Sequence, residues 1–217
     1  MYVQDLIIEV TRKCNLQCQH CLRGNVQRKN INVPMIEEFL VNNEILSVGS
    51  LVLTGGEPFL NPKGIIDLSM VFKKYDISLS SFYIATNGTV SPIPAIQGLC
   101  NFFDMTDDIE YFRIDISSDE YHEYEGIDMH PAWNLITHGS KEGPSYNAVI
   151  AEGRGKELNR TGRTVEDDEW VWEDGDLTEG MIYINALGMI CKACDYSYKT
   201  QSLRNHGYCL SKPLKEF

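Results

Sequence analysis

The stretch Cys14-Asn15-Leu16-Gln17-Cys18-Gln19-His20-Cys21 places three thiols within eight residues, directly after an apolar run at residues 6–10. Thiolates are soft ligands that select iron–sulfur clusters, zinc or copper(I). Three thiols so close together cannot all be disulfide partners of one another, because one is always left over. A cubane cluster usually takes four protein thiolates, so three from one loop can leave its fourth iron open to a small-molecule ligand. An open position is typical of a catalytic metal site.

Two other interpretations of this loop remain open. A zinc knuckle could combine Cys14, Cys18 and Cys21 with a fourth ligand. His20 is a poor fourth ligand, because adjacent residues seldom point at one tetrahedral centre. Buried free cysteines are also common in proteins, but three of them at this spacing in a loop are not.

Strand-like runs alternate with helical patterns along the first 120 residues. Residues 6–10, 51–53, 82–85 and 111–116 predict strands. Helices are expected from Pro34, after the pair Asn61-Pro62, and over residues 94–100, where Cys100 would be a packed helix residue. This alternation predicts an α/β fold with mostly parallel strands. Because a closed barrel usually needs ~250 residues, we expect a partial TIM-like barrel.

Polar motifs follow each of the four predicted strands. They are the cysteine stretch, Gly55-Gly56-Glu57, Asn87, and residues 117–119. In barrels of this kind the active-site residues lie on loops at the carboxyl ends of the strands. The four motifs are therefore expected to share one site.

The whole run Thr11-Arg12-Lys13-Cys14-Asn15-Leu16-Gln17-Cys18-Gln19-His20-Cys21 resembles the cluster loop of the radical S-adenosylmethionine (radical SAM) family, including the ring residue before the third cysteine. The resemblance implies that Cys14, Cys18 and Cys21 hold a [4Fe-4S] cluster. Its open iron would chelate the amino and carboxylate groups of S-adenosylmethionine. An electron from the cluster would split the sulfonium, and the resulting 5'-deoxyadenosyl radical would remove a hydrogen atom from a substrate.

The segment Gly55-Gly56-Glu57-Pro58 resembles the second signature of that family. Two glycines let the backbone approach a ligand closely, and a carboxylate can accept charge-assisted hydrogen bonds from an ammonium group. The resemblance implies that Glu57 accepts from the methionyl ammonium of the cofactor. Taken alone, such a segment is an ordinary turn.

Ser117 and Asp119 resemble the family's Ser-x-Asp pattern, which contacts the ribose or the methionyl carboxylate, and Asn87 resembles the end of the third strand. These residues also have simpler interpretations. Ser117 and Asp119 suit a helix N-cap, Asn87 suits a turn, and Asp115 is a competing candidate on the fourth strand.

The carboxyl-terminal part carries three more cysteines, Cys191, Cys194 and Cys209, after a predicted strand at residues 181–185 that could form a hairpin with residues 189–191. They could bind a second iron–sulfur cluster, form a zinc site with His206 or Asp195, or be ordinary thiols. Many family members that modify peptides carry auxiliary clusters in such an extension, but here the cysteine count falls short of that pattern.

Residues 1–150 are interpreted as the radical SAM core partial barrel. Residues 151–217 are interpreted as the remainder of the barrel plus a short Cys-containing extension, and residues 146–151 as a candidate fifth strand. A basic island at Arg154, Lys156, Arg160 and Arg163 could bind an anionic group of a substrate, with Arg154 the best placed, or could be a solvated loop. The acidic run at residues 166–179 is expected at the surface, with its two tryptophans on the buried face of a hairpin.

The composition limits the classes of partner that the protein is expected to bind and the compartment in which it is expected to lie. A net charge of −12 opposes nucleic-acid binding, which depends on Lys and Arg meeting phosphates. No apolar run approaches the ~20 residues of a membrane span, and no secretory signal is evident. Seven cysteines without such a signal indicate a reducing, cytoplasmic location and metal rather than disulfides.

The sequence therefore predicts an enzyme that cleaves S-adenosylmethionine reductively with a [4Fe-4S] cluster and abstracts a hydrogen atom from a peptide or small molecule. An electron donor such as flavodoxin or ferredoxin is implied. The alternatives are a glycyl-radical activating enzyme and a non-catalytic iron–sulfur or zinc-binding protein. No residue is assigned to catalysis itself.

Overall fold

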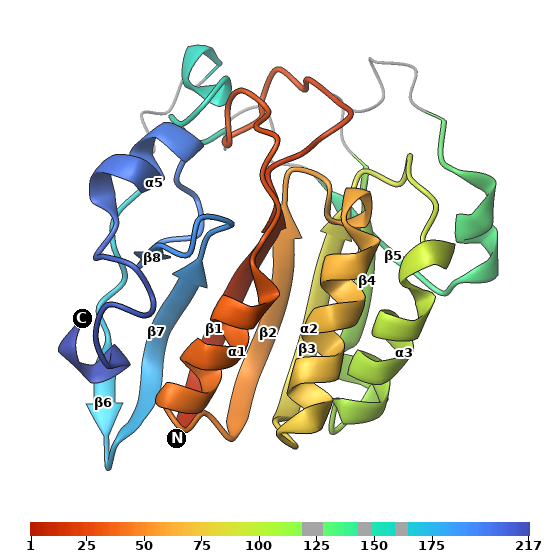
Figure 1. The fold of residues 1–217 in the computed structure, drawn as a ribbon. Coiled ribbons are helices and arrows are strands. Elements are labelled where there is room, and N and C mark those ends of the chain that lie inside the picture. Colours follow the sequence, from red (N-terminus) through yellow and green to blue (C-terminus); the bar gives the residue numbers. More distant parts are fainter. Residues whose placement is uncertain (119–127, 143–148, 159–164) are drawn as a thin grey trace.

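The computed structural model describes residues 1–118, 128–142, 149–158 and 165–217 (Figure 1). The strands in these residues are β1 (Tyr2–Thr11), β2 (Ser47–Gly55), β3 (Ser78–Thr86), β4 (Phe112–Ser118), β5 (Gly139–Glu142), β6 (Val171–Glu173), β7 (Asp176–Ile184) and β8 (Ile190–Cys191). The α-helices are α1 (Val33–Asn42), α2 (Pro62–Lys74), α3 (Ile96–Met105) and α5 (Tyr198–Arg204).

The strands form one open, mostly parallel sheet. Their order is β5-β4-β3-β2-β1-β7-β6, with β8 paired to β7 off this path. All neighbours from β5 to β7 are parallel, and only β6 and β8 run antiparallel to β7. Helices α1, α2 and α3 lie side by side over one face (Figure 1). The prediction of an α/β fold with a partial, unclosed barrel is confirmed.

Strand β1 is central and is buried on both faces. Val3, Leu6 and Ile8 are fully buried in the main hydrophobic core. Ile7, which points to the other face, packs in a second cluster with Tyr183. A parallel strand covered on both faces needs a near-continuous apolar run, which explains the sequence at residues 6–10.

Helix α2 shows how local signals fix the elements next to the site. The Asn61 side chain accepts a hydrogen bond from the Gly64 amide at 3.3 Å, as an N-cap does, and Pro62 occupies the first turn. The Asn61 amide also donates to the Val10 carbonyl at 3.0 Å. This one side chain therefore begins α2 and ties it to the carboxyl end of β1.

Several sequence predictions need correction. The fifth strand lies at Gly139–Glu142. Of the predicted strand at residues 146–151, positions 146–148 lie outside the described residues and 149–151 are not strand. The sequence of β5 has no apolar pattern because it is an edge strand held by backbone pairing to β4. Cys100 lies on α3 as expected, but it is exposed rather than packed.

The carboxyl-terminal part joins the same sheet. The predicted hairpin of β7 with β8 is confirmed. Trp172, on β6, and Trp170, just before it, are partly buried against the main core. The parallel pairing of β7 with β1 was not predicted. Residues 1–150 and 151–217 therefore contribute to one sheet, while their division into two domains stays a prediction.

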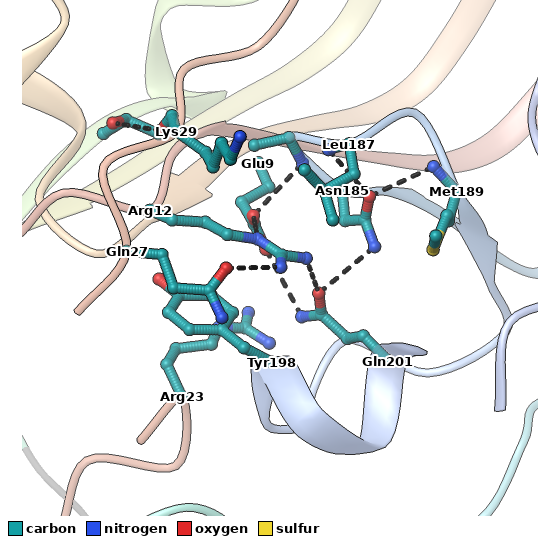
Figure 2. A network of polar contacts seen from close by, with 12 residues as sticks. Glu9, Arg12, Arg23, Gln27, Lys29, Asn185, Leu187, Met189, Tyr198 and Gln201 are labelled. Carbon is teal, nitrogen blue, oxygen red and sulfur yellow. Dashed lines mark hydrogen bonds and ion pairs between the residues drawn. The ribbon is translucent and has the colours of Figure 1, made fainter. Parts of the chain in front are cut away.

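A buried polar network joins the end of β1 to this carboxyl-terminal part (Figure 2). Glu9 has no solvent exposure. Its Oε1 accepts from Arg12 Nε at 2.5 Å and from the Ala186 amide at 3.1 Å, and its Oε2 accepts from the Tyr183 hydroxyl at 2.6 Å. Arg12 also donates through NH2 to Gln201 Oε1 at 2.5 Å. The network therefore ties α5 and β7 to the residues that enter the cysteine stretch.

Replacing Glu9 by Ala should destabilise the protein by about 3–5 kcal/mol, because it leaves the Arg12 guanidinium buried without its carboxylate. The measurement is the free energy of unfolding of the apo-protein in urea. Asp67→Ala, which breaks the exposed Lys63–Asp67 pair, is the matched control. Equal losses in the two variants would show that the buried network contributes no more than a surface pair.

Candidate active site

The three thiols lie on a loop, here called the cysteine loop (residues 12–31), which leaves β1 and returns to it. The Arg12 amide donates to the Lys29 carbonyl at 2.8 Å, and the Ile31 amide donates to the Val10 carbonyl at 3.0 Å. Within the loop the Cys21 amide donates to the Cys18 carbonyl at 3.2 Å. Cys18 is buried, Cys14 and Cys21 are half-buried, and no disulfide joins any of the seven cysteines of the chain. The loop stands at the carboxyl end of β1, where the sequence places it.

The end of β2 is pressed against the cysteine loop. The Gly56 amide donates to the Thr11 carbonyl at 2.8 Å. A Cβ at Gly55, whose φ is +152°, would lie 2.2 Å from the Thr11 carbonyl oxygen. A Cβ at Gly56 would lie 2.3 Å from the Lys13 carbonyl oxygen and 3.0 Å from Cys14 Cβ. The two glycines were expected to admit a ligand, and in the structure they admit the loop that carries the cysteines.

Glu57 is a buried carboxylate at the edge of the sheet where the carboxyl ends of the parallel strands meet the cysteine loop. It is 1% exposed. Its Oε1 accepts from the Thr86 hydroxyl at 2.8 Å and from the Phe59 amide at 3.1 Å, and its Oε2 accepts from the Asn87 amide at 2.8 Å. Burial raises the pKa of Glu57 to about 7 against the opposing effect of these three donors. No ion pair to Glu57 occurs in the described residues, so an added cation would stabilise its charged form.

Asn87 connects the end of β3 with the cysteine loop. Its side-chain amide donates to Asn15 Oδ1 at 3.0 Å, and its Oδ1 accepts from the Thr89 amide at 3.0 Å. Asn15 in turn donates to the Thr89 hydroxyl at 2.6 Å. Asn87 therefore makes a turn, as one interpretation held, and also lines the edge that carries the thiols.

The fourth strand contributes less. Ser117 is half-buried in β4, and Asp119 lies outside the described residues. Asp115, the competing candidate, is buried and accepts from Arg113 NH2 at 2.7 Å. It also meets Gly139 of β5 so closely that a Cβ there would lie 2.3 Å from Asp115 Oδ1. Asp115 is thus already engaged within the sheet.

Arg154 holds the cysteine loop from a part of the chain far along the sequence. Its Nε donates to the Cys18 carbonyl at 2.9 Å and its NH1 to the Gly24 carbonyl at 2.5 Å, while its backbone amide donates to the Cys21 carbonyl at 3.0 Å. The preceding Gly153 fits because a Cβ there would lie 2.6 Å or less from atoms of residues 21, 22 and 24. The basic island was expected to bind substrate or water, and this member of it binds the loop backbone.

Replacing Arg154 by Ala should open the cysteine loop, because two hydrogen bonds from a charged group are lost at about 1.5–3 kcal/mol each. Backbone amides of residues 14–25 in the anaerobic apo-protein should exchange with deuterium on the order of 150-fold faster, the factor that corresponds to about 3 kcal/mol, the lower end of the summed loss. Arg28→Ala, at an exposed position of the same loop, should leave exchange unchanged. Unaltered exchange in Arg154→Ala would contradict this role.

The carboxyl-terminal cysteines do not gather. Cys191 and Cys194 pack in the smaller cluster around Tyr183, whereas Cys209 lies in the main core. Burial raises the pKa of Cys191 and of Cys194 to about 12, and that of Cys209 to about 11, as expected for structural thiols in apolar surroundings. His206, one candidate zinc ligand, faces Asp167 at 3.4 Å. These observations favour the interpretation as ordinary thiols.

The donor set of the cysteine loop suits a cluster better than a single ion. In the described residues no three or more His, Cys, Asp or Glu side chains are arranged to hold one metal ion, which weighs against a zinc knuckle. A cubane binds each thiolate to a different iron, so its ligands stand farther apart than those of one ion. Burial raises the pKa of Cys14, and Glu57, Cys21 and Arg154 all lie within electrostatic reach of it. Three thiols outside any disulfide, beside a buried carboxylate that has no ion pair in the described residues, fit a cluster with a cationic ligand.

A sequence model described as the Radical SAM superfamily matches residues 8–133, more than half of the chain. The chain belongs to the radical SAM superfamily. The match takes in the cysteine loop, the two glycines with Glu57, Asn87 and residues 117–119, and it ends before Arg154. Membership supports an iron–sulfur cluster and S-adenosylmethionine as cofactors and places the chain in a class of enzymes.

Two relatives in the superfamily are each named a probable GTP 3',8-cyclase. The protein of Pyrococcus horikoshii is 35% identical over 89 residues, which are 40% of this chain and 27% of the relative. That of Pyrococcus abyssi is 34% identical over 89 residues, which are 40% of this chain and 28% of the relative. The matched part thus spans little more than a quarter of each relative's length.

Two solved structures share the fold. Native anSMEcpe with bound AdoMet and Kp18Cys peptide has a TM-score of 0.62 at 14% identity, covering 100% of this chain and 80% of that one. BtrN in complex with AdoMet and 2-DOIA has a TM-score of 0.55 at 13% identity, covering 99% and 81%. At these identities the likeness concerns the radical SAM fold alone.

The buried Glu57 carboxylate makes stability depend on pH. Its folded pKa of about 7 lies above the ordinary 4.5, so the stabilising effect of its protonated form is present below pH 4.5 and is lost as pH rises through 7. Relative to Glu57→Gln, the apo-protein should lose roughly 3 kcal/mol of unfolding free energy over this range. Parallel stability–pH curves for the two proteins, from urea unfolding, would contradict the raised pKa.

Proposed function

We propose that this radical SAM protein holds a [4Fe-4S] cluster through Cys14, Cys18 and Cys21 and cleaves S-adenosylmethionine reductively, so that a hydrogen atom is removed from a substrate. The single observation that carries the proposal is the Glu57 carboxylate. It is 1% exposed, has no ion pair in the described residues, and lies on the edge that carries the thiols. Its backbone amide donates to the Lys13 carbonyl, next to Cys14, at 2.7 Å.

The chain's own residues supply binding and orientation. When bound, the cluster supplies the electron that splits the sulfonium, and the cofactor carries the radical chemistry. Glu57 accepts hydrogen bonds from the methionyl ammonium, a charge-assisted contact that strengthens in a site shielded from water. Ser117, and with it Asp119, remains the proposed contact on the ribose side. Asn87 holds Asn15 of the cysteine loop and donates its backbone amide to Glu57, so it orients both partners.

The substrate is proposed as a small molecule or a peptide. The named relatives favour a nucleotide, since both are called probable GTP 3',8-cyclases. The free, scattered thiols of the carboxyl-terminal part lend no support to a second cluster, which was the feature that favoured a peptide. A flavodoxin or ferredoxin is proposed as the electron donor.

The reducing cytoplasm is the proposed location, because seven cysteines without a disulfide suit a compartment that keeps thiols reduced. None of the helices in the described part of the chain has the length and apolar character that crossing a bilayer requires.

The test is anaerobic reconstitution with iron and sulfide, followed by reduction in the presence of S-adenosylmethionine. The wild-type protein should bind about four irons per chain and release 5'-deoxyadenosine. The Cys14→Ala/Cys18→Ala/Cys21→Ala variant should do neither. Cys100→Ala, which removes an exposed thiol outside the loop, should behave as wild type.

Two outcomes would overturn the proposal. A tightly held zinc ion with no cleavage would indicate a binding protein instead. Cleavage that persists in the triple variant would separate the chemistry from the cysteine loop.

A further inference from the structure

A cavity of about 1020 Å³ lies between the cysteine loop, residues 151–158 and α5. Pockets for small molecules commonly measure about 300–1000 Å³, so the cavity has room for a ligand of that class. Its lining does not include Glu57, Asn87 or Ser117. It is therefore distinct from the site proposed for S-adenosylmethionine.

The cavity is positively charged within an acidic protein. The net charge of the chain is −12. Among the described residues, the lining nevertheless carries four cationic side chains, Arg23, Arg154, Lys156 and Lys199, against two carboxylates, Glu152 and Glu157. This excess of positive charge would attract an anion to a molecule whose overall charge repels it.

One of the two carboxylates is already engaged. Glu152 Oε2 accepts from the Thr200 hydroxyl at 2.7 Å and from the Ser197 amide at 3.1 Å. These bonds join residues 151–158 to the start of α5 and fix the shape of the cavity wall.

Two donor groups on the wall have hydrogen-bonding capacity to spare. Tyr198 is 3% exposed, and its buried hydroxyl has no hydrogen-bond partner among the residues that the structure describes. A guanidinium has five N–H donors, and the hydrogen bond that Arg23 makes in the described residues is one from NH1 to the Tyr196 carbonyl at 2.8 Å. Arg154, by contrast, is committed to the carbonyls of the cysteine loop. A buried donor without a partner is uncommon, and an acceptor bound beside the Tyr198 hydroxyl would satisfy it.

We propose that this cavity binds the phosphate group of a small molecule, with Arg23 and Tyr198 on its wall and Lys156 and Lys199, both exposed, at its rim. Arg presents a planar fork that matches phosphate oxygens, and Lys adds a point charge. Three cations available to one ligand exceed the single charge of a carboxylate and match a phosphate group or polyphosphate chain. The inference goes beyond the proposed function, because binding here requires neither S-adenosylmethionine nor its cleavage.

Calorimetric titration of the cluster-loaded protein with inorganic triphosphate, under anaerobic conditions and fixed ionic strength, tests this inference. We expect one site per chain. The Lys156→Ala/Lys199→Ala variant should bind about tenfold more weakly, the factor for about 1.4 kcal/mol. Tyr198→Phe should lose about 3- to 10-fold, although it removes no hydrogen bond that the hydroxyl makes in the structure.

The matched control is Lys73→Ala/Lys215→Ala, which removes two exposed lysines outside the cavity and changes the net charge equally. It should bind as wild type. Absence of binding, equal weakening by the control, or equally tight binding of citrate would overturn the proposal. These results are independent of whether 5'-deoxyadenosine is formed, so failure here leaves the proposed function standing.

Discussion

The site depends on how closely the end of β2 can approach the cysteine loop. A Cβ at Gly56 would lie 2.3 Å from the Lys13 carbonyl oxygen and 3.0 Å from Cys14 Cβ, too close for a side chain to fit. Without that side chain, amides of residues 56 and 57 reach the carbonyls of Thr11 and Lys13. The carboxylate of Glu57 is thereby held on a residue whose own backbone amide contacts the cysteine loop. The spacing between the Glu57 carboxylate and the Cys14 thiol, which are proposed to bind the cofactor and the cluster, thus follows from backbone packing.

Two buried charged groups lie near the contact between β2 and the cysteine loop: the Glu9–Arg12 pair and the Glu57 carboxylate. They differ in whether a side chain of opposite charge neutralises them. The Glu9–Arg12 pair is closed, because the carboxylate and the guanidinium satisfy each other together with Gln201 and Tyr183. The donors to Glu57 in the described residues are all neutral, and burial raises the pKa of this carboxyl against their effect. A fully hydrogen-bonded ion pair contributes to the fold, whereas a buried ionisable group without an ion-pair partner is typical of a site that binds a ligand of opposite charge.

The sequence predicted the elements whose signals are local. The apolar run of β1, the N-cap at Asn61 and the polar residues after each strand are patterns within a few residues, and the structure bears out the strands and the helix start. The predictions were wrong or missing where an element is held by residues far away in the sequence. Strand β5 has no apolar pattern because an edge strand needs only backbone pairing, and Arg154 contacts carbonyls 130 or more positions earlier in the chain. The roles of Ser117 and Asp119 stay predictions.

The anchoring of the cysteine loop by distant residues bears on when the protein can acquire its cofactor. The cysteine loop leaves the ribosome well before Arg154, Gln201 and the partner strand β7, which all lie far later in the sequence. Contacts between such remote positions form late, because the intervening chain must first be ordered. A nascent chain would therefore present three loosely tethered thiols, exposed to stray metals and oxidants. The proposed loading of iron and sulfide would therefore follow synthesis of these later segments, and delivery factors would have to recognise the folded loop rather than the emerging segment.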